Sequence, residues 1–433
     1  MNQSNQAAPA PPRTYPDAHD SDPVRLGWMV GAPPPADKVI SFSNGSFNGF
    51  PRTRWTFSNY RKLVPTVNVA RGGPVHDLPY ALRDDLDGVT FTPLQPSAFA
   101  GPMTWQESLD ANYTDGIVVL HKGRIVYERY FGVLTADCAH IAYSVTKSFV
   151  GTLGAMLVAD GRLDPAAPVS QYLPELANSG FADASIRNLL DMRLGIEFSE
   201  DYTDPTAGIW NFARAGGLLP QPPGYAGPGN FYAFLATVQK NGPHGQGFRY
   251  QTAITEVLAW ILRRVTGQSL EALISSHFWQ PLGMEHDAFL TVDTLGTAFG
   301  GGGFNATLRD QARFGEMMRN GGTAHGKQLV APEVIADITR GGDRAAFKVG
   351  GARRCPAAAT ATCGGSCTTS TAPIRRAAST VRRSTSIRPP RWSSRALPRT
   401  RWRAISTSIR RRCRRIRRSP SGCCKDDKPR TRR

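Results

Sequence analysis

The sequence predicts an α/β (α+β) fold in which an antiparallel sheet is flanked by helices and carries a helical subdomain. Two observations point to it: residues 116–130 have the pattern of a β-hairpin, and much of the chain from 144 to 319 has helical periodicity. Strands at the start, a long helical middle and further strands expected at the end are typical of a sheet with a helical insertion.

The hairpin is predicted from two β-rich runs, IVVL and RIVYERYF, which flank the turn HKGR at 121–124. The first helix after it is predicted from apolar residues at helical spacing, such as Phe149, Leu153 and Met156, and it ends before Gly161. The predicted helices cover residues 144–157, 186–194, 254–265, 268–278 and 307–319.

Composition divides the chain into three segments. Residues 1–75 are rich in Pro, Gly, Ser and Asn, which predicts an extended and partly disordered segment anchored by Trp55 and Phe57. Residues 76–348 form the ordered domain. Residues 349–433 are a basic, low-complexity tail that we expect to be disordered.

The first 350 residues have the features of a cytoplasmic protein. Cys138 is their single cysteine, which excludes a disulfide framework and fits a reducing compartment. The N-terminus lacks the basic start and apolar run of a secretory signal, and no stretch approaches the roughly 20 apolar residues that span a bilayer. We therefore predict no membrane partner.

Nearly all the basic character lies in the tail. From Gly351 to Arg433 there are 24 Lys and Arg against 2 Asp and Glu, which gives this segment a net charge of +22. Because the whole chain carries +18, residues 1–350 carry −4. A basic nucleic-acid-binding tail is one interpretation. Such tails favour Lys with Gly or Ala, whereas this one is rich in Arg and holds six cysteines.

A shift of reading frame in a GC-rich gene is the second interpretation, and we favour it. In the shifted frame, codons for Ala377 to Pro389 are compatible with a strand that contains a His-Gly pair, and a second strand follows an Asp-Pro turn. On this hypothesis the domain as written is incomplete, its C-terminal strands are missing, and no nucleic acid is a partner.

Ser144 and Lys147 form an S-x-x-K motif at the start of a predicted helix. Residues one helical turn apart share a face, so the amine can reach the hydroxyl. A serine hydroxyl is a weak nucleophile until a base removes its proton. The motif is short, and in the alternative interpretation Ser144 is only a helix N-cap and Lys147 a solvated side chain.

The motif lies within segments that resemble the serine β-lactamase and penicillin-binding-protein family, in its class C-like branch with esterases and 6-aminohexanoate-dimer hydrolases. The resemblance covers about 240 residues, and its motifs occur in the family's order. The matching segments are 142–176, 186–205, 248–284 and the glycine-rich 300–322.

The resemblance implies further site residues. Tyr250 matches the family's Y-x-N tyrosine, which supplies a second general base, and cations near a phenol lower its pKa. Thr252 stands where the family has Asn or Ser, and Tyr202 stands where the nylon-hydrolase branch has a substrate-contacting tyrosine. We therefore predict Ser144, Lys147 and Tyr250 as catalytic and Tyr202 and Thr252 as substrate-binding. Tyr250 could instead be a core aromatic, and Tyr202 a loop residue.

These observations predict a serine hydrolase that cleaves an amide or ester through an acyl-enzyme, on 6-aminohexanoate-type linear amides or short esters. We expect a small-molecule substrate, no metal and no organic cofactor. The family's third motif, K-T-G or H-x-G on a terminal strand, is absent from the sequence as written. The alternative is therefore a catalytically impaired or dead member, truncated by the frameshift.

Overall fold

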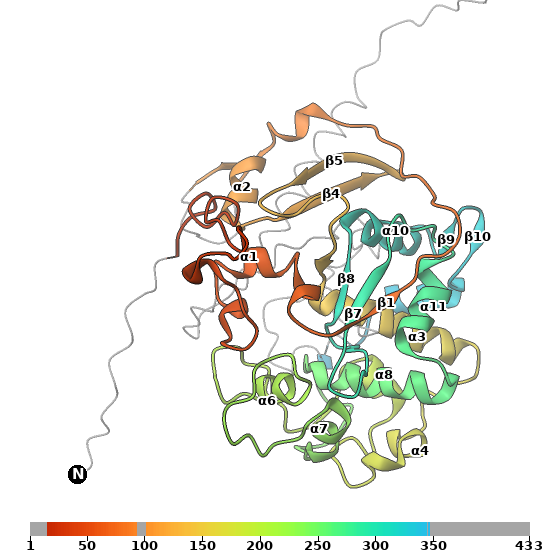
Figure 1. Cartoon of the computed structure of the whole chain (residues 1–433). Coiled ribbons are helices and arrows are strands. Elements are labelled where there is room, and N and C mark those ends of the chain that lie inside the picture. The colour runs from red at the N-terminus through yellow and green to blue at the C-terminus, as the bar shows by residue number, and fades with distance from the viewer. Residues whose placement is uncertain (1–14, 93–100, 344, 347–433) are drawn as a thin grey trace, which may run out of the picture. The chain divides into compact units, whose positions relative to one another are not determined.

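A computed structural model describes residues 15–92, 101–343 and 345–346 (Figure 1). The chain separates into two compact units. Within the described residues, one unit holds 15–82 and 111–346 and the other holds 83–92 and 101–110. The smaller unit is a short antiparallel pair in which Trp105 N donates to Val89 O at 2.8 Å. Its elements are η4 (Asp84–Leu86), β2 (Thr90–Phe91), β3 (Met103–Thr104) and all but the last residue of α2 (Trp105–Ala111).

The larger unit contains a four-stranded antiparallel sheet in the order β1-β7-β8-β6. In the pairing of β6 with β8, His140 lies opposite Ala306 and Ile141 opposite Asn305. The chain that leaves β6 therefore starts beside the chain that enters β8. The strands are β1 (Thr66–Val69), β6 (His140–Ile141), β7 (Ala288–Thr291) and β8 (Phe304–Ala306).

The predicted hairpin is confirmed as β4 (Gly116–His121) and β5 (Arg124–Tyr130), which pair antiparallel. Its two turn residues, Lys122 and Gly123, have φ values of 54° and 76°. Two consecutive positive φ angles are typical of the turn whose twist matches a right-handed strand pair. A second small hairpin joins β9 (Thr323–Ala324) and β10 (Lys327–Gln328).

The predicted helices are present, with shifted ends. The helix expected at 144–157 begins as a 3₁₀ turn, η5, before α3; the one expected at 186–194 ends at Leu190; and the one expected at 268–278 passes from α9 into a π-helical turn, η7. Their bounds are η5 (Tyr143–Val145), α3 (Thr146–Ala159), α5 (Ile186–Leu190), α8 (Thr252–Thr266), α9 (Leu270–Ile274), η7 (Ser275–Trp279) and α10 (Leu308–Arg319). The remaining ones are α4 (Val169–Tyr172), η6 (Pro174–Leu176), α6 (Gly208–Ala215), α7 (Phe231–Thr237) and α11 (Pro332–Arg340).

Helix α8 is the centre of the helical layer and contacts α3, α4, α5, α6, α7 and α9 (Figure 1). Its residues Ile254, Leu258 and Ile261 are fully buried, as are Phe149 and Val150 on α3. Burying a large apolar side chain contributes about 1.5–3 kcal/mol, so this contact fixes the two helices firmly. It also fixes their N-terminal ends, from which the candidate site is built. Within the described residues no helix is both long and apolar enough to cross a bilayer.

The N-terminal segment holds more regular structure than its composition predicts. Trp55 and Phe57, the two expected anchors, are 5% and 2% exposed and belong to a buried apolar cluster. Beside them, Arg54 Nε donates to Asp115 Oδ1 at 3.2 Å, and both side chains are buried. The short helices of this segment are η1 (Ala36–Lys38), η2 (Ser46–Asn48), α1 (Thr53–Thr56) and η3 (Tyr60–Lys62). The predicted tail and the terminal strands expected from a shifted reading frame lie outside the described residues.

Candidate active site

Ser144 lies where the chain turns from the sheet into α3. Ala142 N donates to Phe304 O at 2.7 Å, which extends the pairing of β6 and β8 to the edge of the turn. Tyr143 then has a φ of 42°, a conformation that costs a residue with a side chain of order 1–3 kcal/mol. Ser144 follows in the 3₁₀ turn and is half-buried. Backbone strain next to a candidate nucleophile is typical of functional sites.

Lys147 lies in the first turn of α3 and is 1% exposed. Its Nζ donates to Ser144 Oγ at 3.0 Å, as the spacing of the motif predicts. The same Nζ donates to the carbonyl oxygen of Gly301. A buried amine thus has two oxygen partners, one of them the serine hydroxyl, so the alternative of a solvated surface lysine is excluded.

Tyr250 lies just before α8, and its ring centroid is 5.1 Å from Lys147 Nζ. The peptide before it is held by Arg249 N, which donates to Met192 O at 2.9 Å. An amine at this distance from an aromatic ring is attracted by the ring electrons. The structure therefore brings the Ser144 hydroxyl, the Lys147 amine and the ring of Tyr250 together from the beginnings of α3 and α8.

The glycine-rich segment 300–303 approaches the site with bare backbone. A Cβ atom on Gly301 would lie 2.5 Å from Thr252 Cγ2 and 2.6 Å from Phe299 Cε2, closer than side chains pack. Only glycine therefore fits this position without a shift of its neighbours. The absence of a side chain lets the carbonyl of Gly301 reach Lys147.

Glu256 on α8 holds this segment from the other side. Its carboxylate is fully buried; Oε2 accepts from Gly300 N at 2.7 Å and from Gly301 N at 3.1 Å, and Oε1 accepts from Arg263 Nη2 at 3.1 Å. Burial raises the pKa of the Glu256 carboxyl, while Arg263 and the two amides oppose that rise.

Glu200 joins the two residues predicted to bind substrate. Thr252 donates to its carboxylate twice, from N at 2.6 Å and from Oγ1 at 2.8 Å, and Tyr202 donates its hydroxyl to Oε1 at 2.6 Å. The carboxylate thus lies at the N-terminus of α8, where the helix dipole favours negative charge. Tyr202 is 41% exposed, whereas Thr252 is 4% exposed and donates its hydroxyl to Glu200, so direct contact of Thr252 with substrate remains a prediction.

Sequence reasoning missed both glutamates. Glu200 is two residues before Tyr202, and this proximity is the signal that could have found it. Glu256 is 44 and 45 residues from its glycine partners, so only the folded chain reveals the contact.

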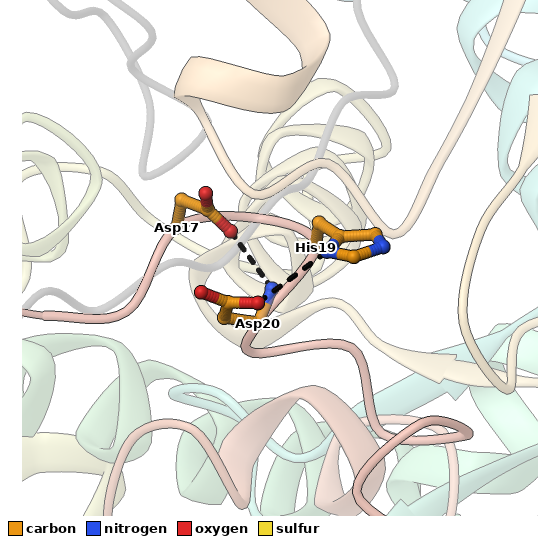
Figure 2. A group of neighbouring side chains, drawn as sticks. All are labelled: Asp17, His19 and Asp20. Atoms are coloured by element: carbon orange, nitrogen blue, oxygen red, sulfur yellow. Dashed lines mark hydrogen bonds and ion pairs between the residues drawn. The ribbon is translucent and has the colours of Figure 1, made fainter.

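One exposed group among the described residues has the spacing of a metal site, with ligand atoms of Asp17, His19 and Asp20 within 4.8 Å of one another (Figure 2). Its atoms already have protein partners. Asp17 Oδ1 accepts from Asp20 N at 2.7 Å, and the His19 ring contacts both Asp20 and the guanidinium of Arg25. We assign it no metal.

Comparison with known proteins identifies hydrolases as relatives. The sequence profile described as Beta-lactamase matches residues 110–356. The chain is 35% identical over 336 residues to the 6-aminohexanoate-dimer hydrolase of Paenarthrobacter ureafaciens, a match that covers 78% of this chain and 77% of the relative. It is 28% identical over 196 residues to esterase EstB of Burkholderia gladioli, which covers 41% of this chain and 47% of the esterase.

A solved structure from Bacillus anthracis, provisionally assigned as a 6-aminohexanoate-dimer hydrolase, has a similar fold. It superposes with a TM-score of 0.64 at 30% sequence identity, over 70% of this chain and 78% of that one. Sequence and fold therefore indicate the same group of hydrolases.

Proposed function

The chain belongs to the β-lactamase family of hydrolases, and from that premise we propose that it cleaves an amide or ester bond through an acyl-enzyme formed on Ser144. The observation that carries the proposal is the hydrogen bond of 3.0 Å between Lys147 Nζ and Ser144 Oγ at a buried position. A base within hydrogen-bonding reach of a hydroxyl is the first requirement for activating it.

The reaction proceeds in two steps. Ser144 Oγ attacks the substrate carbonyl while its proton moves to Lys147, and the backbone N–H of Ser144 stabilises one side of the oxyanion. Lys147 and Tyr250 return the proton to the nitrogen or oxygen of the leaving group. Water then attacks the acyl-enzyme, the same groups remove its proton, and the acid product leaves with Ser144 restored.

The proposed substrate class is a linear amide of the 6-aminohexanoate type or a short ester. Two relatives support it: the amidase relative shares 35% identity over most of both chains, and the esterase relative shares 28% over a shorter segment. Exposed Tyr202, linked to Glu200, is the side chain we propose to contact the substrate. The reaction needs no metal or organic cofactor.

A catalytically impaired member is the second candidate, because no K-T-G or H-x-G motif follows residue 300, where the family has it on a terminal strand. That motif would lend the second oxyanion donor. Loss of one such donor typically lowers the rate by about 10²–10³-fold. On this candidate the chain binds substrate and acylates slowly.

The test compares turnover of a p-nitrophenyl ester and of the linear 6-aminohexanoate dimer by the wild-type chain, Ser144→Ala and Ser148→Ala. Ser148 lies one turn further along α3 and is the matched control. We expect Ser144→Ala to abolish turnover and Ser148→Ala to keep it. Turnover by Ser144→Ala at the wild-type rate would refute the proposal, and a folded wild-type chain that turns over neither substrate would favour the impaired member.

A further inference from the structure

Glu256 is a buried carboxylate that the proposed reaction does not use. It is fully buried on α8, and its ligands are two consecutive backbone amides and one arginine. We propose that Glu256 is a positioning residue for the catalytic lysine, acting through the backbone of Gly300 and Gly301. This inference rests on the proposed function of the Ser144 and Lys147 pair.

The connection passes through a single residue. Gly301 N donates to Glu256 Oε2 at 3.1 Å, and the carbonyl oxygen of the same glycine accepts from Lys147 Nζ. Only the two backbone dihedrals of Gly301 separate the anchored amide from that carbonyl, but glycine has the widest choice of dihedrals of any residue. An anchor on the N–H side therefore restricts the direction in which the carbonyl can point.

The second amide strengthens the anchor. Gly300 N donates to the same Oε2 at 2.7 Å, so one oxygen orients two successive peptide groups. Hydrogen bonds to an ionised carboxylate are roughly twice as strong as those between neutral groups. Arg263 Nη2, at 3.1 Å from Oε1, supplies the opposing charge that a buried carboxylate requires.

The space around Gly300 makes the contact specific. A Cβ atom there would lie 2.5 Å from the Cβ of Ala259, one turn along α8 from Glu256, and 3.5 Å from Glu256 Oε2. The glycine segment is thus pressed onto the face of α8 that carries the carboxylate. The lysine amine is held between Ser144 Oγ and a carbonyl whose direction α8 sets.

The chain offers a matched control in Asp310 on α10. Asp310 is also fully buried, and it accepts from two consecutive amides, Glu285 N at 2.7 Å and His286 N at 3.1 Å, and from Arg313 Nη1 at 3.2 Å. The two sites are similar but not identical, because the amides of Asp310 bind different oxygens and Thr307 Oγ1 also donates to it at 2.8 Å. Neither amide belongs to a residue with a hydrogen bond to Lys147. Replacing Asp310 therefore measures how much stability is lost when such a buried carboxylate is removed, without an effect on the lysine.

The experiment measures kcat and KM on a p-nitrophenyl ester, per folded molecule, for the full-length wild type, Glu256→Gln, Asp310→Asn and Ser144→Ala. We expect Glu256→Gln to lower kcat by about 10²-fold with KM within about twofold, because a misplaced catalytic group costs about that much. We expect Asp310→Asn to lower the melting temperature as much or more, with kcat within about threefold. Equal kcat in Glu256→Gln and the wild type, or equal losses in Glu256→Gln and Asp310→Asn, would overturn the inference.

A second pair of variants covers the case in which Glu256→Gln does not fold. Gly300→Ala should lower kcat, because its Cβ must push the segment away from Ala259. Adding Ala259→Gly should restore most of the loss, since it removes the atom that the new Cβ meets. Wild-type kcat in Gly300→Ala, or no recovery in the double variant, contradicts the positioning role.

Crystal structures of these variants give a readout that does not depend on turnover. In Glu256→Gln or Gly300→Ala the bond from Lys147 Nζ to Gly301 O should be lost, and its retention overturns the inference. Ser144→Ala distinguishes a failure of the proposed function from a failure of this inference. If Ser144→Ala keeps full turnover, the proposed function is wrong. If Ser144→Ala is inactive while Glu256→Gln matches the wild type, only the role of Glu256 is wrong.

Discussion

Two buried carboxylates in this chain have similar hydrogen-bond partners but hold different segments of backbone. Glu256 and Asp310 each accept from two successive backbone amides and face an arginine on their own helix. Burial raises the pKa of both carboxyl groups. The amides that Asp310 holds precede β7, whereas one of those that Glu256 holds belongs to Gly301, the partner of Lys147.

The difference shows that a buried charge is not by itself a sign of catalysis. Ion pairs that hold the fold also perturb pKa values. What distinguishes Glu256 is that one of its amide donors belongs to Gly301, whose carbonyl accepts from Lys147. Variants at the site and away from it separate effects on catalysis from effects on stability.

The largest effect is expected for Lys147→Met, which keeps an unbranched side chain of similar length in the buried position and removes the amine. We expect kcat/KM on the p-nitrophenyl ester to fall by about 10²–10⁴-fold, the usual contribution of a general base. Circular dichroism should show an unchanged helix content. A variant that folds and keeps at least a tenth of the wild-type kcat/KM would show that another group accepts the proton from Ser144.

Asp310→Asn is expected to affect stability alone. The substitution leaves Arg313 facing a neutral amide at a fully buried position, and breaking such a pair costs about 3–5 kcal/mol. Urea unfolding should give a free energy of unfolding lower by about that amount. Unchanged stability would mean that Arg313 is satisfied by its bond to Glu285 at 2.6 Å and that the two carboxylates are not equivalent after all.

Thr252→Val tests the link between α8 and Glu200 with a change of one atom. The hydroxyl that donates to Glu200 Oε1 is lost, while the backbone N–H of residue 252 still donates to Oε2. A single hydrogen bond contributes about 0.5–1.5 kcal/mol and one to a charged group about 1.5–3 kcal/mol, so we expect kcat/KM to fall about tenfold, mainly through KM. If kcat falls and KM stays constant, the threonine acts on the chemical step instead.

The smallest effect is a pH dependence of stability away from the site, at His244. Burial lowers the pKa of His244, against the nearby carboxylate of Asp183, and the ring accepts a hydrogen bond from Gly195 N at 3.1 Å. Between this lowered pKa and the ordinary value of about 6.5, the unfolded chain binds more protons, so stability rises with pH in that window and is lost as pH falls.

The check is urea unfolding of the wild type and His244→Asn at several pH values from 5 to 8. The variant should lack part of the rise in unfolding free energy between the lowest pH and about 6.5. An identical pH slope in both proteins would show that His244 does not contribute to it.

Local patterns predicted much of this fold. The turn at Lys122 and Gly123 was predictable because a short turn sequence with glycine between two β-rich runs favours the positive φ angles of a hairpin turn. The long helices were predictable from the spacing of their apolar residues. The one-turn spacing of Ser144 and Lys147 predicted their hydrogen bond for the same reason. Helix ends were displaced because capping and 3₁₀ or π-helical turns depend on neighbours outside the helix.

What could not be predicted arises from contacts between distant segments. The bonds from Gly300 and Gly301 to Glu256 exist because the segment before β8 packs against α8, and no local pattern encodes that contact. The structure of the N-terminal segment was underestimated for a related reason. Its Pro-rich and Gly-rich sequence forms short irregular helices that are stabilised by packing of Trp55 and Phe57 rather than by propensity.

The most direct test of the account asks which atom becomes acylated. Full-length protein would be treated with a fluorescent fluorophosphonate, digested with trypsin and mapped by tandem mass spectrometry. We predict that the label lies in peptide 130–147, that fragment ions place it on Ser144, and that Ser144→Ala takes up none. A label on another residue, or equal labelling of Ser144→Ala, would contradict the account.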